Sequence, residues 1–251
     1  LQPIELLKPF FVIIISLILA IEKYQNKYFK YLISLFVLFP LVLFLISQPD
    51  LGQTLLILFT WLVLVFVSGI SLIIFFSFFI FFIGLTSYLI FFIPKFEYIK
   101  IRIMSFLDSS SGNNYQSEKA SEAIVSGGFF GKGIGEGTLN NRIPEAHTDY
   151  IVSVISEEFG IIIVIAIILI FIFLTFQVIK KIALEEDNKV KLILLGLASI
   201  LILQTFVHIG VNIRALPTTG MTLPFLSYGG SSIISNSILA GTILNLTRRK
   251  I

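Results

Sequence analysis

The chain has 251 residues, of which 56% are hydrophobic and 13% are charged, and its formal net charge is +3. Such a composition is far from that of a soluble globular domain and predicts an all-α polytopic membrane protein. The absence of Cys excludes disulfides, thiol nucleophiles and cysteine metal sites, and the presence of only two His argues against a histidine-rich metal centre.

The first predicted span covers residues 4–21. Because the chain begins at Leu1 and no small-residue cleavage site follows this apolar run, we expect a fragment that lacks its N-terminal part and has no signal peptide. Glu5 and Lys8 lie three residues apart on one face of the span. Either Lys8 extends its amine to the membrane interface, or the two charges form a functional pair inside the protein.

The next predicted spans follow a basic loop that contains Lys23, Lys27 and Lys30. One covers residues 31–47, and a turn at residues 48–52 then contains Asp50, which is by default only a turn residue. Residues 51–94 carry no charge and would form about 66 Å of helix, twice the roughly 30 Å of a bilayer core. We therefore expect two spans, 51–68 and 72–93.

Residues 94–148 form the one long predicted loop. Its first part, which includes Arg102, has the pattern of an interfacial helix, and residues 117–126 are expected to form a short helix that ends at Gly127. The glycine-rich run 127–137 is not a P-loop, because Gly133 follows Lys132 where Ser or Thr is needed. It is either a pliable loop or a set of backbone amides that face a phosphate.

Residues 150–176 are predicted to form one helix of about 40 Å, longer than the bilayer core, so its start stands in water. A helical stripe that begins at Asp149 continues through Ser153, Ser156, Glu157 and Gly160, and we expect it to face other helices. Asp149 itself is open to two interpretations. It is either a reactive carboxylate beside His147 or a charge that favours the helix start, where Thr148 is the cap.

The last two predicted spans differ in character. Residues 192–213 carry Gln204, His208 and Asn212 on one stripe, with Arg214 just beyond, and interhelical hydrogen bonding is expected for Gln204 and His208. Residues 233–247 are too short to cross a bilayer, so the Pro-Gly-Ser stretch 216–232 must complete the crossing and is expected to line the cavity of Asp149. Close packing of small residues is the alternative for residues 229–232.

These elements predict a single membrane domain, residues 1–251, with seven transmembrane helices. Ten of the 18 Lys and Arg lie in short segments on one side, which the positive-inside rule makes cytoplasmic together with the C-terminus. The extracytoplasmic side then carries the loop 94–148 together with Glu5, Asp50 and Arg214.

Motifs along nearly the whole chain resemble the SEDS family, whose branches are FtsW and RodA. The motifs at residues 144–149 and 217–224 look more like those of FtsW. The other matching stretches are residues 2–8, 48–52, 106–108, 115–116, 126–137 and 157–160. The family has ten spans, so the resemblance implies that this chain corresponds to spans four to ten.

The resemblance implies a peptidoglycan glycosyltransferase of the bacterial inner membrane that polymerises lipid II in cell division or elongation. Asp149 is then the catalytic residue, for which we predict the role of general base. The expected substrate-binding residues are Glu5, Lys8, Asp50, Arg102, Glu145, His147, Glu157, Arg214 and Ser231.

The partners implied by the resemblance are lipid II, a class B penicillin-binding protein, other membrane proteins of the divisome or elongasome, and membrane lipid, without nucleic acid. No cofactor is certain, and a divalent Mg or Mn ion is the one candidate. A lipid II flippase is the alternative function, because a polar cavity beside a broken helix also suits transport. A division scaffold without chemistry is a third.

Overall fold

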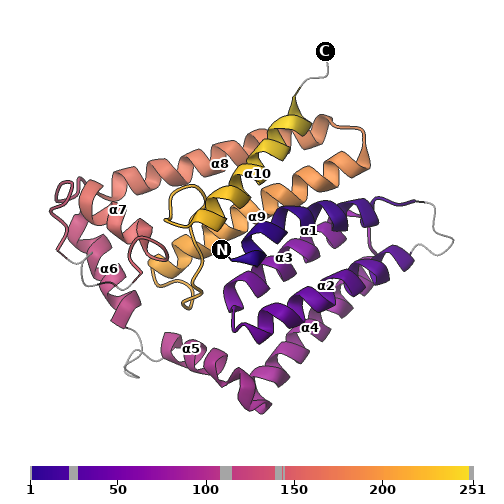
Figure 1. Ribbon diagram of the computed structural model, residues 1–251, viewed down its shortest axis with the longest axis horizontal. Coiled ribbons are helices and arrows are strands. Elements are labelled where there is room, and N and C mark those ends of the chain that lie inside the picture. The colour runs from indigo at the N-terminus through magenta and orange to yellow at the C-terminus, as the bar shows by residue number, and fades with distance from the viewer. Residues whose placement is uncertain (1, 23–27, 108–114, 139–142, 144, 249–251) are drawn as a thin grey trace. The chain divides into compact units, whose positions relative to one another are not determined.

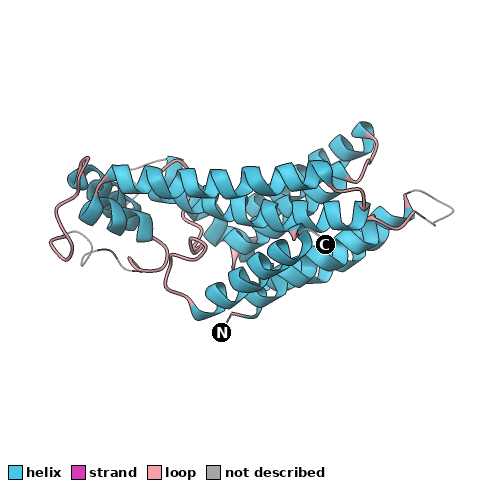
Figure 2. Cartoon of the chain, turned by 90° about the horizontal axis from the view of Figure 1, so that it is seen from above, coloured by secondary structure: helices cyan, strands magenta, loops and turns pink. Residues whose placement is uncertain are grey.

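The structure is a computed structural model that describes residues 2–22, 28–107, 115–138, 143 and 145–248. All regular elements in this part of the chain are helices, which confirms the predicted all-α class (Figures 1 and 2). Residues 108–114 of the predicted long loop and the basic residues Lys23 and Lys27 lie outside the described residues. The described chain divides into two compact units, and each is considered by itself.

Unit 1 comprises residues 1–69, 167–206 and 221–251. Its helices are α1 (Pro3–Leu19), α2 (Phe29–Ser47), α3 (Leu51–Val67), α10 (Gly230–Thr247) and the larger parts of α8 (Ile161–Leu184) and α9 (Asn188–Asn212). Helix α1 packs against α2, α3 and α10. In its core, the buried Trp61 of α3 donates a hydrogen bond of 3.2 Å to Ser34 Oγ of α2.

The uncharged run after Asp50 forms two helices, as predicted. Helix α3 begins where the Asp50 side chain accepts a hydrogen bond of 3.0 Å from the Gln53 amide, so Asp50 is its N-cap. The helix ends before Gly69, whose φ of 87° belongs to the left-handed region. Helix α4 (Leu72–Phe92) then begins in unit 2.

Four helices in the described part of the chain are long and apolar enough to cross a membrane, namely α2, α4, α8 and α9. Helix α3 is apolar but shorter. The total of seven spans therefore stays a prediction. The apolar character of the four helices supports the assignment to a membrane.

Unit 2 comprises residues 70–166 and 207–220. After α4 come η1 (Pro94–Phe96), α5 (Glu97–Leu107), α6 (Tyr115–Gly127) and α7 (Ile151–Phe159). The predicted short helices thus both form, and Phe96 and Ile99 are buried in this unit. Helices α6 and α7 pack against each other.

The continuous helix predicted for residues 150–176 is wrong, because it breaks at Gly160 into α7 and α8. Gly160 has a φ of 85°, and three backbone hydrogen bonds join the residues around this break to residues 128–133. Lys132 N donates to Glu157 O (2.9 Å), Gly133 N to Glu158 O (3.0 Å), and Ile161 N to Gly128 O (3.0 Å). Carbonyls at the end of α7 are therefore satisfied by the loop instead of by another helical turn.

We call residues 127–133 the glycine strap. A Cβ atom would lie 1.9 Å from Ser156 O at Gly127, 2.2 Å from Glu158 O at Gly131 and 2.1 Å from Phe129 O at Gly160. Only glycine allows this approach of two backbones. The amides of Lys132 and Gly133 donate to carbonyls of α7, so this part of the run is a structural clamp. These two amides therefore do not support the predicted phosphate site.

Replacement of Gly160 by Ala should unfold this corner. The added Cβ meets the Phe129 backbone and the φ is unfavourable, so we expect a loss of about 1–3 kcal/mol or more in stability. Thermal unfolding in detergent measures the change. Gly84→Ala in α4 is the control, because nothing lies within 4 Å of its Cβ position. Equal melting temperatures of the two variants would contradict the clamp.

Candidate active site

Asp149 lies in a turn of residues 145–150 that leads into α7 and is partly exposed. Its amide donates to Glu145 O (3.0 Å), and its own carbonyl accepts a hydrogen bond of 3.0 Å from Asn212 Nδ2 of α9. The predicted cap was wrong, because Thr148 Oγ1 donates to Glu145 instead, and the N-cap Tyr150 has no side-chain cap. The turn therefore holds Asp149 by its main chain, and the residue stays partly exposed.

The polar stripe of α7 faces inward, as predicted. Ser153, Ser156 and Glu157 are fully buried. Glu157 Oε1 accepts hydrogen bonds from Lys132 Nζ (2.9 Å) and from the Thr138 amide (3.0 Å). These contacts join Glu157 to the glycine strap through Lys132 and to the loop after the strap through Thr138, so Glu157 supports this corner of unit 2.

Part of the irregular segment between α9 and α10 comes close to Asp149. Gly220 has a φ of 71°, and a Cβ at that position would lie 3.6 Å from Asp149 Oδ2. The backbone of Gly220 thus approaches the carboxylate in a conformation that favours glycine.

Tyr150 and Arg102 show the electrostatics around Asp149. Burial, with a further contribution from the Asp149 charge, raises the pKa of Tyr150 to about 12, and Arg102 opposes the rise. Arg102 also lies over the Tyr98 ring at 6.0 Å. The charges of Arg102 and Asp149 therefore shift the pKa of the Tyr150 phenol in opposite directions.

The remaining predicted residues of unit 2 are exposed or partly exposed. Glu145 and His147 are exposed in the turn beside Asp149, and Glu145 has a φ of 58°. Arg214 Nη2 lies 3.8 Å from Glu118 Oε1 of α6, and the arginine side chain keeps 32% of its surface exposed. Each of these three side chains therefore keeps part of its surface exposed.

Glu5 and Lys8 form a buried ion pair in unit 1, with 2.6 Å between Glu5 Oε2 and Lys8 Nζ. Both side chains are within 2% of full burial, so the interpretation as an interfacial lysine is wrong. Gln53 Nε2 donates to Glu5 Oε1 (2.6 Å), and Lys8 Nζ donates to Gln204 Oε1 (3.1 Å). Each charge of the pair therefore makes one further hydrogen bond to an amide side chain.

The polar chain continues from Gln204 into the irregular segment and α10. Gln204 Nε2 donates to Thr222 O (2.9 Å), and Thr222 Oγ1 and Ser232 Oγ share a hydrogen bond of 2.9 Å. Asn236 Nδ2 donates to Ser232 Oγ (3.2 Å). The neighbouring Ser231 accepts from the Gln2 amide at 2.9 Å. The predicted interhelical role of Gln204 is thereby confirmed.

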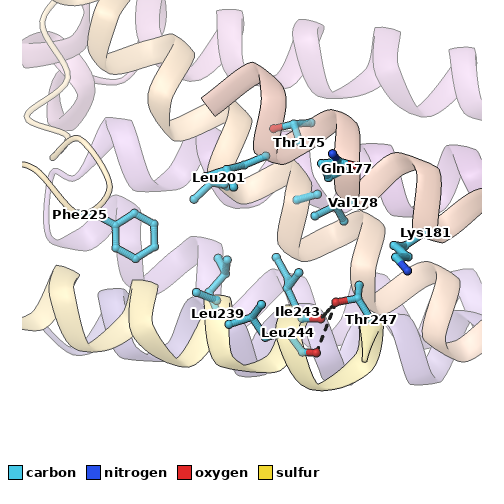
Figure 3. Close-up of a pocket in the computed structure, with 13 residues that line it drawn as sticks. Thr175, Gln177, Val178, Lys181, Leu201, Phe225, Leu239, Ile243, Leu244 and Thr247 are labelled. Atoms are coloured by element: carbon cyan, nitrogen blue, oxygen red, sulfur yellow. Dashed lines mark hydrogen bonds between the residues drawn. The ribbon is translucent and has the colours of Figure 1, made fainter. Parts of the chain in front are cut away.

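A groove of about 320 Å³ lies between α8, α9 and α10 in unit 1. Its lining is almost wholly apolar, and Phe225 and Lys181 stand at opposite ends (Figure 3). None of the predicted site residues lines it. Among the residues that the structure describes, no three or more His, Asp or Glu side chains are grouped to hold a metal ion, so the Mg or Mn ion stays a prediction.

Comparison with known families decides the assignment. The family model described as "Cell cycle protein", which covers FtsW, RodA and SpoVE, matches residues 1–251. The chain belongs to this family. The predicted resemblance to SEDS proteins is thus confirmed, and the apolar helices agree with a multi-pass membrane protein.

Two similar proteins carry the name probable peptidoglycan glycosyltransferase FtsW. That of Caulobacter vibrioides is 33% identical over 259 residues, which covers 100% of this chain and 63% of the relative. That of Buchnera aphidicola subsp. Baizongia pistaciae is 40% identical over 210 residues, which covers 80% of this chain and 53% of the relative. The chain thus spans less than two thirds of the length of either relative.

Solved structures share the fold. One chain comes from a peptidoglycan synthase complex described by its coordination of polymerization and crosslinking, with a TM-score of 0.78, 27% identity and coverage of 99% of this chain and 70% of that chain. The rod shape determining protein RodA of Thermus thermophilus gives a TM-score of 0.65 at 28% identity, and the match covers 98% of this chain and 64% of that chain.

The ion pair generates a prediction about stability. Lys8→Ala leaves Glu5 charged and buried, which should cost about 3–5 kcal/mol, whereas Lys189→Ala at an exposed position should change little. The double variant Glu5→Gln/Lys8→Met should recover part of the loss because no charge stays unpaired. Thermal unfolding in detergent tests the series, and a Lys8→Ala protein as stable as Lys189→Ala contradicts it.

Tyr150 generates a prediction about alkaline pH. Its folded pKa of about 12 exceeds the ordinary value of 10, so its contribution to stability is complete below pH 10 and is lost as the pH rises through 12. Asp149→Asn should lower the Tyr150 pKa, because it removes a negative charge that opposes phenolate formation. Tyrosine NMR titration, with Tyr150→Phe to assign the signal, measures both values, and an unchanged pKa in Asp149→Asn would contradict the proximity.

Proposed function

We propose that this chain is the catalytic membrane portion of a peptidoglycan glycosyltransferase that polymerises lipid II, with Asp149 as the general base. The observation that carries the proposal is the placement of Asp149, whose main chain is fixed at both N–H and C=O while the residue stays partly exposed. The names of the relatives, which are probable peptidoglycan glycosyltransferases, support the reaction class.

The reaction needs one proton acceptor. The 4-hydroxyl of the acceptor sugar attacks the anomeric carbon of the donor, and Asp149 takes the hydroxyl proton as the new bond forms. The bond from the anomeric carbon to the diphosphate breaks, and the diphosphate leaves with the electron pair. Glycosidases need a second carboxyl group to protonate an alkoxide, whereas a diphosphate leaves without that help, so one carboxylate suffices.

The leaving diphosphate needs positive charge. Arg102 and Arg214 are cations of unit 2 that keep part of their surface exposed, and we assign them to this task. Glu145 and His147 stand in the turn with Asp149 and are assigned to the sugar hydroxyls. Glu157 supports the corner through the Lys132 contact.

In unit 1 we assign Glu5, Lys8, Asp50 and Ser231 to the polar wall of the lipid II site. The support for Glu5, Lys8 and Asp50 is the chain of hydrogen bonds that starts at the Asp50 cap and runs through the ion pair, and Ser231 accepts a separate bond from the Gln2 amide. Charged groups inside a membrane protein usually mark a functional path.

We further propose an outward-facing active site, a cytoplasmic C-terminus and a class B penicillin-binding protein as partner, together with other divisome or elongasome proteins. The distribution of Lys and Arg supports the orientation. The similar chain from a complex that couples polymerization and crosslinking supports a transpeptidase partner.

Asp149→Asn should abolish polymerisation without loss of folding. The change keeps the shape and removes the base, which typically supplies about 10²- to 10⁴-fold in rate. The assay follows glycan products from lipid II in vesicles that contain the full-length protein and its partner. Asp187→Asn in the exposed loop before α9 is the matched control and should be fully active, whereas Glu145→Gln and Glu157→Gln should keep some activity.

The same vesicles separate the proposal from its rivals. A flippase would move labelled lipid II across the membrane without polymer, and a scaffold would tolerate substitution at Asp149. Near-normal glycan formation by Asp149→Asn would falsify the base assignment and move it to Glu145.

A further inference from the structure

Helix α7 begins without a cap of its own. Its N-cap residue, Tyr150, makes no side-chain hydrogen bond to the first turn. A helix start leaves amide groups without helical partners, and a Ser, Thr, Asp or Asn at the N-cap normally accepts from the second or third of them. Asp149, the candidate base, directly precedes this uncapped residue.

Asn212, the last residue of α9, supplies the missing cap from a distance of 59 residues along the chain. Its Oδ1 accepts from the Ser153 amide at 3.2 Å and from Ser153 Oγ at 2.9 Å. Ser153 is the third residue of α7, so the bond to Asn212 is the one that a local N-cap would make, and the same amide also donates to Tyr150 O at 3.0 Å.

The other end of the same carboxamide holds the residue before the helix. Asn212 Nδ2 donates to Asp149 O at 3.0 Å and to His208 O at 2.8 Å. A carboxamide has two acceptor and two donor positions, and all four are used in a side chain that is fully buried. Asp149 and the start of α7 are thereby joined to one rigid group.

We propose that Asn212 is a positioning residue for Asp149, in that it fixes the main chain from which the base projects. This inference rests on the proposed function. Only a carboxamide can fill the role, because an aspartate would accept from Ser153 but would present a negative oxygen to two carbonyls. A misplacement of about 1 Å at a reacting group can cost on the order of 10²-fold in rate.

The test compares Asn212→Asp and Asn212→Ala with Val211→Ala in the full-length protein. Val211 is buried in the cluster that packs the same corner, with Tyr150 and Val154, but makes no polar contact there. The rate of lipid II polymerisation is measured against donor concentration, and thermal unfolding is recorded for each variant. A residue that only stabilises the fold should behave as Val211→Ala does.

We expect both Asn212 variants to lower kcat by about tenfold or more while the donor KM stays within about twofold. Val211→Ala should lose thermal stability and keep kcat within about twofold. A kcat in the Asn212 variants that matches Val211→Ala overturns the inference, and so does a change confined to KM. If neither Asn212 variant folds, Ser153→Ala decides, since it removes one of the four hydrogen bonds and should lower kcat alone, whereas an unchanged kcat overturns the inference.

The failure of the proposed function gives a different result. If Asp149→Asn polymerises normally, the base assignment is wrong whatever Asn212 does. If Asp149→Asn is inactive and the Asn212 variants resemble Val211→Ala, only the positioning role fails.

Discussion

The irregular backbone between α9 and α10 is the constraint on which both units depend. A membrane offers no water to unpaired backbone groups, so such a segment must find its hydrogen bonds inside the protein. In unit 1, Gln204 donates to the carbonyl of Thr222, and Ser227 Oγ accepts from the Leu223 amide at 2.8 Å. In unit 2, the amides of Ala215 and Leu216 both donate to Gly210 O. Gln204 therefore has a structural role, because it satisfies a backbone carbonyl of the irregular segment.

The same logic explains why the buried ion pair of unit 1 is not isolated. A lysine and a glutamate in a dry interior are stable only when their remaining hydrogen-bonding positions are satisfied. Gln53 satisfies Glu5, Gln204 satisfies Lys8, and Gln204 then reaches the irregular segment. A hydrogen-bonded chain of this kind restricts each member, so the charge pair on α1 and the backbone at Thr222 are parts of one rigid arrangement.

Hydropathy and turn residues were enough to predict most helices, because lipid imposes the same length and apolarity on every span. They predicted the break at Gly69 and the helix that ends at Gly127. They failed at Gly160, where a helical pattern continues on both sides of the glycine and the break is held by hydrogen bonds to the glycine strap, far away in sequence. Asn212 belonged to the predicted polar stripe, but spacing along a helix cannot identify the residues to which its side chain binds.

For the site residues, too, the sequence identified the candidates, and only the structure distinguishes their roles. Asp149 and Glu157 lie on one predicted helical stripe, and their spacing gave no reason to separate their roles. The structure separates them by burial, since Glu157 is fully buried on Lys132 whereas Asp149 is partly exposed. Helix α7, of nine residues, is held by the strap at its C-terminal end and by Asn212 at its start. Because α7 is so short, a shift at either of its ends would move Asp149 at its start. The position of the candidate base therefore depends on the glycine strap as well as on Asn212.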